Sequence, residues 1–254
     1  MIGRVKSAVQ SSARKLGVDV VRYRAPVSEF HSDAYLRHNA RRLEHLASLR
    51  LPVAGRTVLE VGAGIGDHSH YYLDRGCAVT ITEARSENLD FLRQRYPDCD
   101  VRHLDLEEPE LDAPQPFDVV HCYGLLYHLK QPEAALAFLA EHTGGVLLLE
   151  TCVSYGADEA VHPTPENRAN PSQAVSGMGC RPTRGWIWGQ LERWFEHVYL
   201  PRTQPNHEQF PVDWARAGAA NRDGLTRAVF VASRRPIENE ALVHALLDRQ
   251  TRHA

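Results

Sequence analysis

A glycine-rich turn that follows an acidic residue is the part of this sequence best suited to hold a ligand. In VLEVGAGIGDHS, residues 58–69, an apolar run interrupted by Glu60 leads into Gly62, Gly64 and Gly66 and then into a polar, helix-compatible segment. Glycines between a strand and a helix let a ligand approach the backbone and expose the helix N-terminus to an anionic group. The segment therefore predicts a cofactor bound between a strand and a helix.

The spacing of these glycines does not match the dinucleotide-binding pattern G-x-G-x-x-G. Counted from Gly62, the third glycine would fall at Asp67, and counted from Gly64 it would fall at Ser69. The observed pattern is E-x-G-x-G-x-G, with Glu60 two residues before the first glycine. A carboxylate at this point repels a pyrophosphate and attracts an ammonium group. The turn therefore indicates a ligand that carries an amino acid.

The elements that must position this turn follow a strict alternation. Amphipathic stretches that predict helices separate apolar runs that predict strands, and these runs are 57–63, 78–84, 100–106, 117–123 and 145–151, with 198–201 and 227–235 later in the chain. Alternating strands and helices form β-α-β units, whose parallel sheet is covered by helices on both faces. The sequence therefore predicts an α/β fold with an open, doubly wound sheet.

One domain with three additions to its core is expected. The 254 residues, 43% of them hydrophobic and 24% charged, suit a protein with a single sizeable core. The core is expected over 57–233, after a helical extension at 1–50. A stretch rich in proline, glycine and serine at about 152–184 predicts a lid, because a loop this long usually covers a binding site. Residues 238–252 predict a C-terminal helix.

The extension is expected to hold two helices. The first fifty residues are basic, and a short amphipathic helix near their start could touch a membrane surface or a partner weakly, although a leading helix packed on the core is the favoured interpretation. The second helix is expected to begin at Ser32 or Asp33. Its apolar face is expected to hold Leu36, Leu43, Leu46 and Leu49.

Charge and cysteine content exclude several classes of protein. The formal net charge of −3 gives no overall attraction to a polyanion, so DNA is not expected as a partner and RNA is not favoured. The five cysteines form no C-x-x-C pair and are expected to be buried, reduced thiols. No signal-peptide core or membrane-spanning run is apparent, which predicts a cytoplasmic protein.

The segment VLEVGAGIGDHS resembles the first motif of the class I S-adenosylmethionine (SAM)-dependent methyltransferases. The resemblance extends over 57–233 and implies a Rossmann-like sheet of seven strands whose last strand is antiparallel. It also implies that Glu83 binds the ribose hydroxyls and that Asp105 receives the adenine amino group. The cofactor-binding residues that it implies are Glu60, Gly62, Ala63, Gly64, Gly66, Glu83, Ala84, Asp105, Leu106, Cys122 and Tyr123.

The fourth strand runs into G-L-L-Y-H-L, which resembles a segment at the boundary of cofactor and substrate in one subgroup of that family. The resemblance implies that His128 lies beside or beneath the donor methyl group. Because a hydroxyl nucleophile profits from a general base, His128 is the first candidate, and a structural histidine is the alternative. Tyr127 is the second catalytic candidate, and Glu150, Tyr155 and His68 are further candidates for the base.

The acceptor site is expected to involve the lid. An arginine such as Arg181 could clamp a carboxylate or phosphate, and a tryptophan could stack on a sugar or ring. The substrate residues expected here are Glu150, Tyr155, Arg181, Trp186 and Trp188. Trp194 is expected in the core. No metal is expected, because His68 and His70 diverge on a helix and lack a third ligand.

Three functions follow from the resemblance. The first is methyl transfer from SAM to a hydroxyl oxygen of a small-molecule or glycan acceptor, with S-adenosylhomocysteine (SAH) as product. The second is modification of RNA, since the G-L-L-Y-H-L segment also resembles that of tRNA wobble-uridine modifiers. The third is a noncatalytic SAM-binding protein, against which the acids at all three cofactor positions argue.

Overall fold

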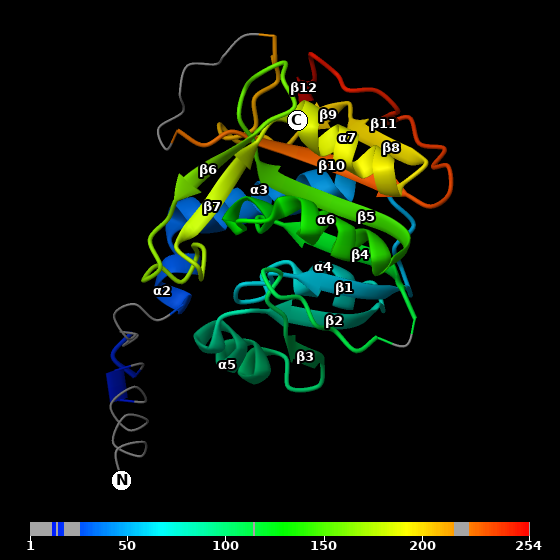
Figure 1. The fold of residues 1–254 in the computed structure, drawn as a ribbon. Coiled ribbons are helices and arrows are strands. Elements are labelled where there is room, and N and C mark those ends of the chain that lie inside the picture. Colours follow the sequence, from blue (N-terminus) through cyan, green and yellow to red (C-terminus); the bar gives the residue numbers. More distant parts are fainter. Residues whose placement is uncertain (1–11, 14, 18–25, 114, 216–223, 254) are drawn as a thin grey trace.

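An eight-stranded sheet forms the centre of the molecule in the computed structural model, which describes residues 12–13, 15–17, 26–113, 115–215 and 224–253 (Figure 1). The strand order is β11-β8-β10-β5-β4-β1-β2-β3. The strands are β1 (Thr57–Val61), β2 (Ala78–Glu83), β3 (Asp100–His103), β4 (Phe117–Tyr123), β5 (Thr143–Cys152), β8 (His197–Pro201), β10 (Arg227–Ser233) and β11 (Leu242–Val243). The predicted leading helix lies largely outside the described residues.

The sheet is mostly parallel, as predicted. Parallel pairing joins β3, β2, β1, β4 and β5, whereas β10 lies antiparallel between β5 and β8. Every residue of β10 is buried, which is typical of a strand covered on both faces. The predicted doubly wound, Rossmann-like sheet is confirmed, with its antiparallel strand, and the eighth strand is the two-residue β11.

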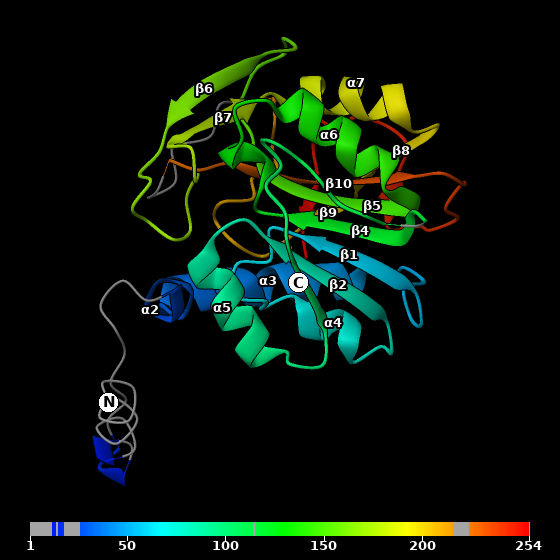
Figure 2. The same ribbon diagram turned by 60° about the horizontal axis from the view of Figure 1, so that its bottom comes forward.

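Helices cover both faces of the sheet, which Figure 2 shows edge-on. On one face α6 (Pro132–Glu141) and α7 (Arg184–Trp194) pack through Leu136, Leu139 and Leu191. The other face holds α3 (Asp33–Ser48), α4 (Ser69–Leu73) and α5 (Ser86–Arg95). Two apolar clusters, one on each face, therefore fix the sheet. No helix among the described residues is both long and apolar enough to cross a membrane.

The helix α3 follows the short α2 (Pro26–Phe30) and buries an unusual face. Its N-cap is Ser32, whose side chain accepts from the Tyr35 backbone N–H, as the capping prediction required. Leu46 and Leu49 are buried as predicted, but Leu36 is 45% exposed. The buried side also holds His38, Asn39, Arg42 and His45. Because buried polar groups need partners, this face indicates a polar site beneath α3.

The predicted lid contains a hairpin. The strands β6 (Val161–Pro165) and β7 (Met178–Pro182) pair antiparallel, and their connecting loop reaches toward α5 (Figure 2). The base of the hairpin packs on the short 3₁₀ helix η1 (Leu126–His128). The lid, which follows β5 in the chain, therefore packs on η1 and reaches across the carboxyl edge of the sheet.

The predicted C-terminal helix over 238–252 is wrong. This segment is extended, with β11 paired to β8 and β12 (Thr251–Arg252) paired to β9 (Thr203–Gln204). The edge strand β8 offers unpaired backbone groups, and Leu242 is buried when it pairs there. Gln250 donates to the Pro201 carbonyl at 2.6 Å. These tertiary contacts outweigh the helical spacing of the local sequence.

Candidate active site

A cleft opens at the carboxyl ends of β1, β2 and β4, where open α/β sheets bind their ligands. Part of the cleft is open to solvent, and charged, polar and apolar side chains line it. Most of the predicted cofactor residues line it, namely Glu60, Gly62, Ala63, Gly64, Glu83, Ala84, Asp105, Leu106 and Tyr123. The structure thus brings these residues together around one cleft.

The glycines of the turn have conformations that a side chain would strain. Gly62 and Gly66 have φ of +71° and +80°. A Cβ on Gly62 would lie 2.8 Å from Leu125 Cδ2, and one on Gly66 would lie 2.5 Å from Tyr96 Cε2. Gly66 does not line the cleft. It shapes the turn against α5, where the Tyr96 hydroxyl donates to the Gly66 carbonyl at 2.6 Å.

Glu83 ends β2 beside the glycine turn, and backbone groups already hold its carboxylate. The Gly64 N–H donates to Oε2 at 2.8 Å, and the N–H groups of Ala84 and Arg85 both donate to Oε1 at 2.9 Å. Burial raises the pKa of Glu83, and these bonds oppose that shift. Two carboxylate oxygens accept about four hydrogen bonds, so one position remains for a ligand in this arrangement.

Glu60 lies beneath the turn with 2% of its surface exposed. Its Oε2 accepts from the Ser69 hydroxyl at 2.5 Å. Burial raises the pKa of Glu60 to about 7, so the carboxyl group is partly protonated at neutral pH when no cation is near. A cationic ligand in the cleft would favour its charged form.

Four residues that line the cleft each have a buried polar atom without a partner among the described residues. These buried atoms are Arg42 Nε, His68 Nε2, Asn88 Oδ1 and Tyr123 Oη. Unpaired buried polar groups are costly, so their gathering at one cleft indicates a polar ligand that completes them. A ligand with an amino-acid group and a nucleoside fits this mixture of donors and acceptors.

Two other predicted cofactor residues differ in their placement. Asp105 lines the cleft, and its Oδ1 accepts from the Glu107 N–H at 3.0 Å. Cys122 does not line the cleft. Successive side chains of a strand point to opposite faces, so Cys122 lies in the apolar core opposite Tyr123, and burial raises its pKa to about 12. Its side chain is therefore not available to a cofactor.

His128 lines the cleft at the end of η1, with 10% of its side chain exposed. Its Nδ1 forms a hydrogen bond with Glu166 Oε2, which comes from the lid directly after β6. Burial lowers the pKa of His128, and the hydrogen bond to Glu166 opposes the shift. Sequence reasoning missed Glu166, because nothing local to PTPEN marks it as a partner of a residue 38 positions away.

Tyr127, the second predicted catalytic residue, does not line the cleft. Its phenol accepts from Arg227 Nη2 at 3.0 Å, and burial raises its pKa. Glu150, predicted to bind substrate, is 0% exposed and pairs with Arg42 Nη2 at 2.5 Å and with Arg227 Nη1 at 3.1 Å. Glu150, Arg42 and Arg227 form a buried ionic network that Tyr127 joins through Arg227, and only Arg42 among these four also lines the cleft. Neither Tyr127 nor Glu150 can reach a ligand in this arrangement.

The remaining predicted substrate residues also lie outside the cleft. Trp186 and Trp188 pack against the core from α7, whereas Trp194, expected in the core, is 41% exposed. The Tyr155 ring lies 5.6 Å from that of Trp214. Arg181 lies on β7 of the lid but does not line the cleft, and it donates to the Tyr127 carbonyl at 3.3 Å. The lid therefore supplies other residues than those predicted, and they are Pro171, Ser172, Gln173, Ala174, Val175 and Ser176.

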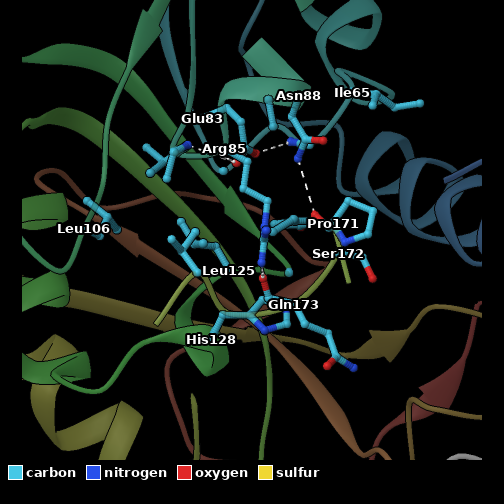
Figure 3. Close-up of a pocket in the computed structure, with 18 of the residues that line it drawn as sticks. Ile65, Glu83, Arg85, Asn88, Leu106, Leu125, His128, Pro171, Ser172 and Gln173 are labelled. Carbon is cyan, nitrogen blue, oxygen red and sulfur yellow. Dashed lines mark hydrogen bonds between the residues drawn. The ribbon is translucent and has the colours of Figure 1, made fainter. Parts of the chain in front are cut away.

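The loop of the lid is fixed over the cleft by two side chains next to Glu83 (Figure 3). Arg85 Nη2 donates to the Gln173 carbonyl at 2.7 Å, and Asn88 Nδ2 donates to the Pro171 carbonyl at 3.4 Å. The loop is thus held next to the end of β2, where Glu83 lies. Over the described ranges, no group of three potential metal ligands is found.

Comparisons with known proteins agree with this architecture. A family model described as "Methyltransferase domain" matches residues 33–215. A tRNA U34 carboxymethyltransferase of Shewanella sediminis (strain HAW-EB3) is 36% identical over 136 residues, which make up 50% of this chain and 39% of that protein. The chain spans about half or less of the length of the curated relatives it matches.

Solved structures share the fold at low identity. The N-terminal domain of EvdMO1 with SAH bound has a TM-score of 0.60 and 22% identity, over 91% of this chain and 97% of that one. A SAM-dependent methyltransferase from Mesorhizobium loti has a TM-score of 0.55 and 20% identity, over 78% of this chain and 100% of that one. With the family match over most of its length, the chain belongs to the methyltransferase domain family, as a class I SAM-dependent methyltransferase.

Proposed function

We propose that this protein transfers the methyl group of SAM to a hydroxyl oxygen of a small-molecule or glycan acceptor and releases SAH. The observation that carries the proposal is a histidine at the cofactor cleft whose Nδ1 is held by a carboxylate, the His128–Glu166 pair. Within the described part of the chain, His128 Nε2 has no hydrogen-bond partner. A histidine held in this way is suited to accept a proton from a hydroxyl group.

In this proposal the cofactor lies along the carboxyl edge of the sheet. Glu60 attracts its ammonium group, Glu83 accepts from the ribose and Asp105 receives the adenine amino group. One hydroxyl fits the free position of the Glu83 carboxylate, and a turn of that side chain would admit the second. SAM supplies a methyl group on a positively charged sulfur, and this charge disappears when the methyl group is transferred.

The transfer is an in-line displacement, so positioning the acceptor and excluding water contribute most of the catalysis. The loop of the lid covers one side of the cleft, and α3 covers another with Asn39 and Arg42. His128 then takes the hydroxyl proton as the oxygen–carbon bond forms and the carbon–sulfur bond breaks. The covered cleft favours an acceptor small enough to enter beside the cofactor.

RNA modification is a second candidate, because the curated relatives named above are tRNA enzymes. Against it stands the formal net charge of −3, which gives no overall attraction to RNA. The solved neighbours include an EvdMO1 domain crystallised with SAH and D-fucose. A sugar-like acceptor is therefore the first class to try.

Incubation with methyl-labelled SAM separates these acceptor classes. The acceptors are a set of hydroxylated sugars, a set of phenols and bulk tRNA, and label is counted in the small-molecule fraction and in precipitable RNA. We expect label in a sugar or phenol and none in tRNA. Label confined to tRNA would replace the proposal by the second candidate.

The same assay tests the role of His128. Replacing His128 with asparagine is expected to lower kcat by about 10²–10⁴-fold, because the general base is lost, while SAH binding is kept. His142, which is hydrogen-bonded to the Phe138 carbonyl on α6, serves as the matched control His142→Asn. A His128→Asn turnover within a fewfold of the parent would leave the histidine a structural role.

A further inference from the structure

The base of the lid is joined to the 3₁₀ helix that carries His128. Arg181 Nη1 donates to the Tyr127 carbonyl at 3.3 Å, and Cys180 Sγ lies 3.6 Å from the Leu126 carbonyl. Gly179 makes this contact possible, because a Cβ there would lie 2.3 Å from the Tyr127 carbonyl oxygen. The strand β7 and the residues around His128 therefore form one packed unit.

The tip of the lid is joined to the opposite side of the cleft. Figure 3 shows Arg85 and Asn88 reaching from the end of β2 and from α5 to the carbonyls of Gln173 and Pro171. The lid is thus held at two places, at its base by η1 and at its tip by α5. Arg85 and Asn88 from one attachment and His128 from the other all line the cleft.

Glu166 connects these two attachments. Its Oε2 accepts from the Ala174 N–H of the tip at 2.8 Å and also bonds to His128 Nδ1. Its Oε1 lies 3.5 Å from Arg181 Nη2 in β7. Only 5% of the Glu166 side chain is exposed, so the carboxylate depends on these partners. Movement of the tip would remove one of them.

We propose that Glu166 is the positioning residue of His128, and that its hold on the imidazole depends on the docked lid. This inference rests on the proposed function. A carboxylate without a proton only accepts hydrogen bonds, so His128 must carry its proton on Nδ1, and Nε2 keeps the lone pair that a base needs. Histidine otherwise favours the proton on Nε2, which would leave His128 unable to accept a proton from the cleft.

The charges around His128 support this assignment. Burial lowers its pKa, Arg181 and Arg227 lower it further, and Glu166 raises it. The pKa of Glu166 is itself lowered, since the bond to His128 and its other partners outweigh burial. At neutral pH the pair is therefore a neutral imidazole beside a carboxylate, which is the state that the role requires.

The tautomer of His128 can be measured directly on the full chain without an acceptor. Long-range ¹H–¹⁵N NMR on protein labelled at histidine distinguishes protonated from unprotonated ring nitrogens, and a His128→Asn spectrum assigns the signal. We expect the Nδ1–H form in the wild type and the Nε2–H form in Glu166→Ala. Glu166→Gln should keep the Nδ1–H form, because its amide oxygen can still accept.

Two controls keep the test specific. Glu159→Ala, an exposed residue at the base of the same lid, should leave the His128 tautomer unchanged. SAH titration of each variant reports whether the cleft is intact. The NMR measurement of the tautomer needs no turnover. A failure of the proposed function would therefore appear as missing SAH binding or missing methyl transfer, and not as a changed tautomer.

The outcomes are decisive in both directions. An Nε2–H tautomer in the wild type, or an unchanged tautomer in Glu166→Ala, would overturn the proposal. The wild-type spectrum alone decides if Glu166→Ala does not fold. Once an acceptor is known, Glu166→Ala should lower kcat by at least about 10²-fold and move the acidic limb of the kcat/KM profile to lower pH. A purely structural role would lower activity without moving that limb.

Discussion

Replacement of Glu150 by alanine is expected to lower the free energy of unfolding by about 3–5 kcal/mol, because it leaves two buried guanidinium groups without their carboxylate. Glu150 is 0% exposed, and Arg42 and Arg227 are 4% and 5% exposed at their side chains. Urea denaturation of the full chain measures the effect. Glu150→Gln keeps the volume and one acceptor oxygen but loses the charge, so its free energy of unfolding should lie between those of the parent and Glu150→Ala.

The matched control is a surface ion pair. Arg193 Nη1 lies 2.5 Å from Glu133 Oε1, but both side chains are more than half exposed. Exposed pairs contribute about 0–1 kcal/mol, so Glu133→Ala should differ little from the parent. A Glu150→Ala protein as stable as the parent, yet without activity, would restore Glu150 as a substrate residue.

Replacement of Glu60 by glutamine is expected to stabilise the free protein and to weaken SAM binding. The pKa of Glu60 is raised from an ordinary 4.5 to about 7 by burial. The unfolded chain therefore loses this proton at a lower pH than the folded protein. The resulting destabilisation is absent below about pH 4.5, grows as the pH rises and is complete above about pH 7, where it is on the order of 3 kcal/mol.

The Tm of Glu60→Gln should thus exceed that of the parent at pH 8, and the difference should vanish near pH 4.5. The affinity of Glu60→Gln for SAM should instead be lower than that of the parent. Loss of a hydrogen bond to a charged group costs about 1.5–3 kcal/mol, or roughly 10–100-fold in Kd. The parent should bind SAM more tightly at pH 8 than at pH 6, because Glu60 ionises between them, and the variant should lose this dependence.

Calorimetric titration with SAM at pH 6, 7 and 8 gives these affinities. The control is Glu107→Gln at another acid that lines the cleft, because its amide oxygen can still accept from the Lys130 N–H as the carboxylate does at 2.9 Å. If Glu60→Gln bound SAM as tightly as the parent does at pH 8, Glu60 would not be part of the site for the ammonium group.

The parts of the site that follow single strands could be predicted from sequence. Glu60, Gly62 and Glu83 lie within a few residues of strand ends, and the β-α-β alternation brings those ends to one edge. The same reasoning places Asp105 beside them. Local apolar patterns therefore determine the sheet, its covered faces and the cofactor half of the cleft.

The rest depends on contacts between distant positions. Glu150 is 108 residues from Arg42, and no local feature of LLLETC distinguishes a substrate ligand from a buried ionic partner. Tyr127 and His128 are neighbours in sequence but face different partners, Arg227 and Glu166. The polar buried face of α3 is the one missed signal that the sequence did contain, because His38, Asn39 and Arg42 recur at helical spacing.

Binding of the cofactor is the most direct test of this account. Isothermal titration of the purified protein with SAM and SAH, with NAD as the comparison ligand, measures it without knowledge of the acceptor. We predict micromolar binding of both sulfur compounds and no binding of NAD, since Glu60 attracts an ammonium group and repels a pyrophosphate. Binding of NAD, or of neither sulfur compound, would contradict the assignment of the cleft.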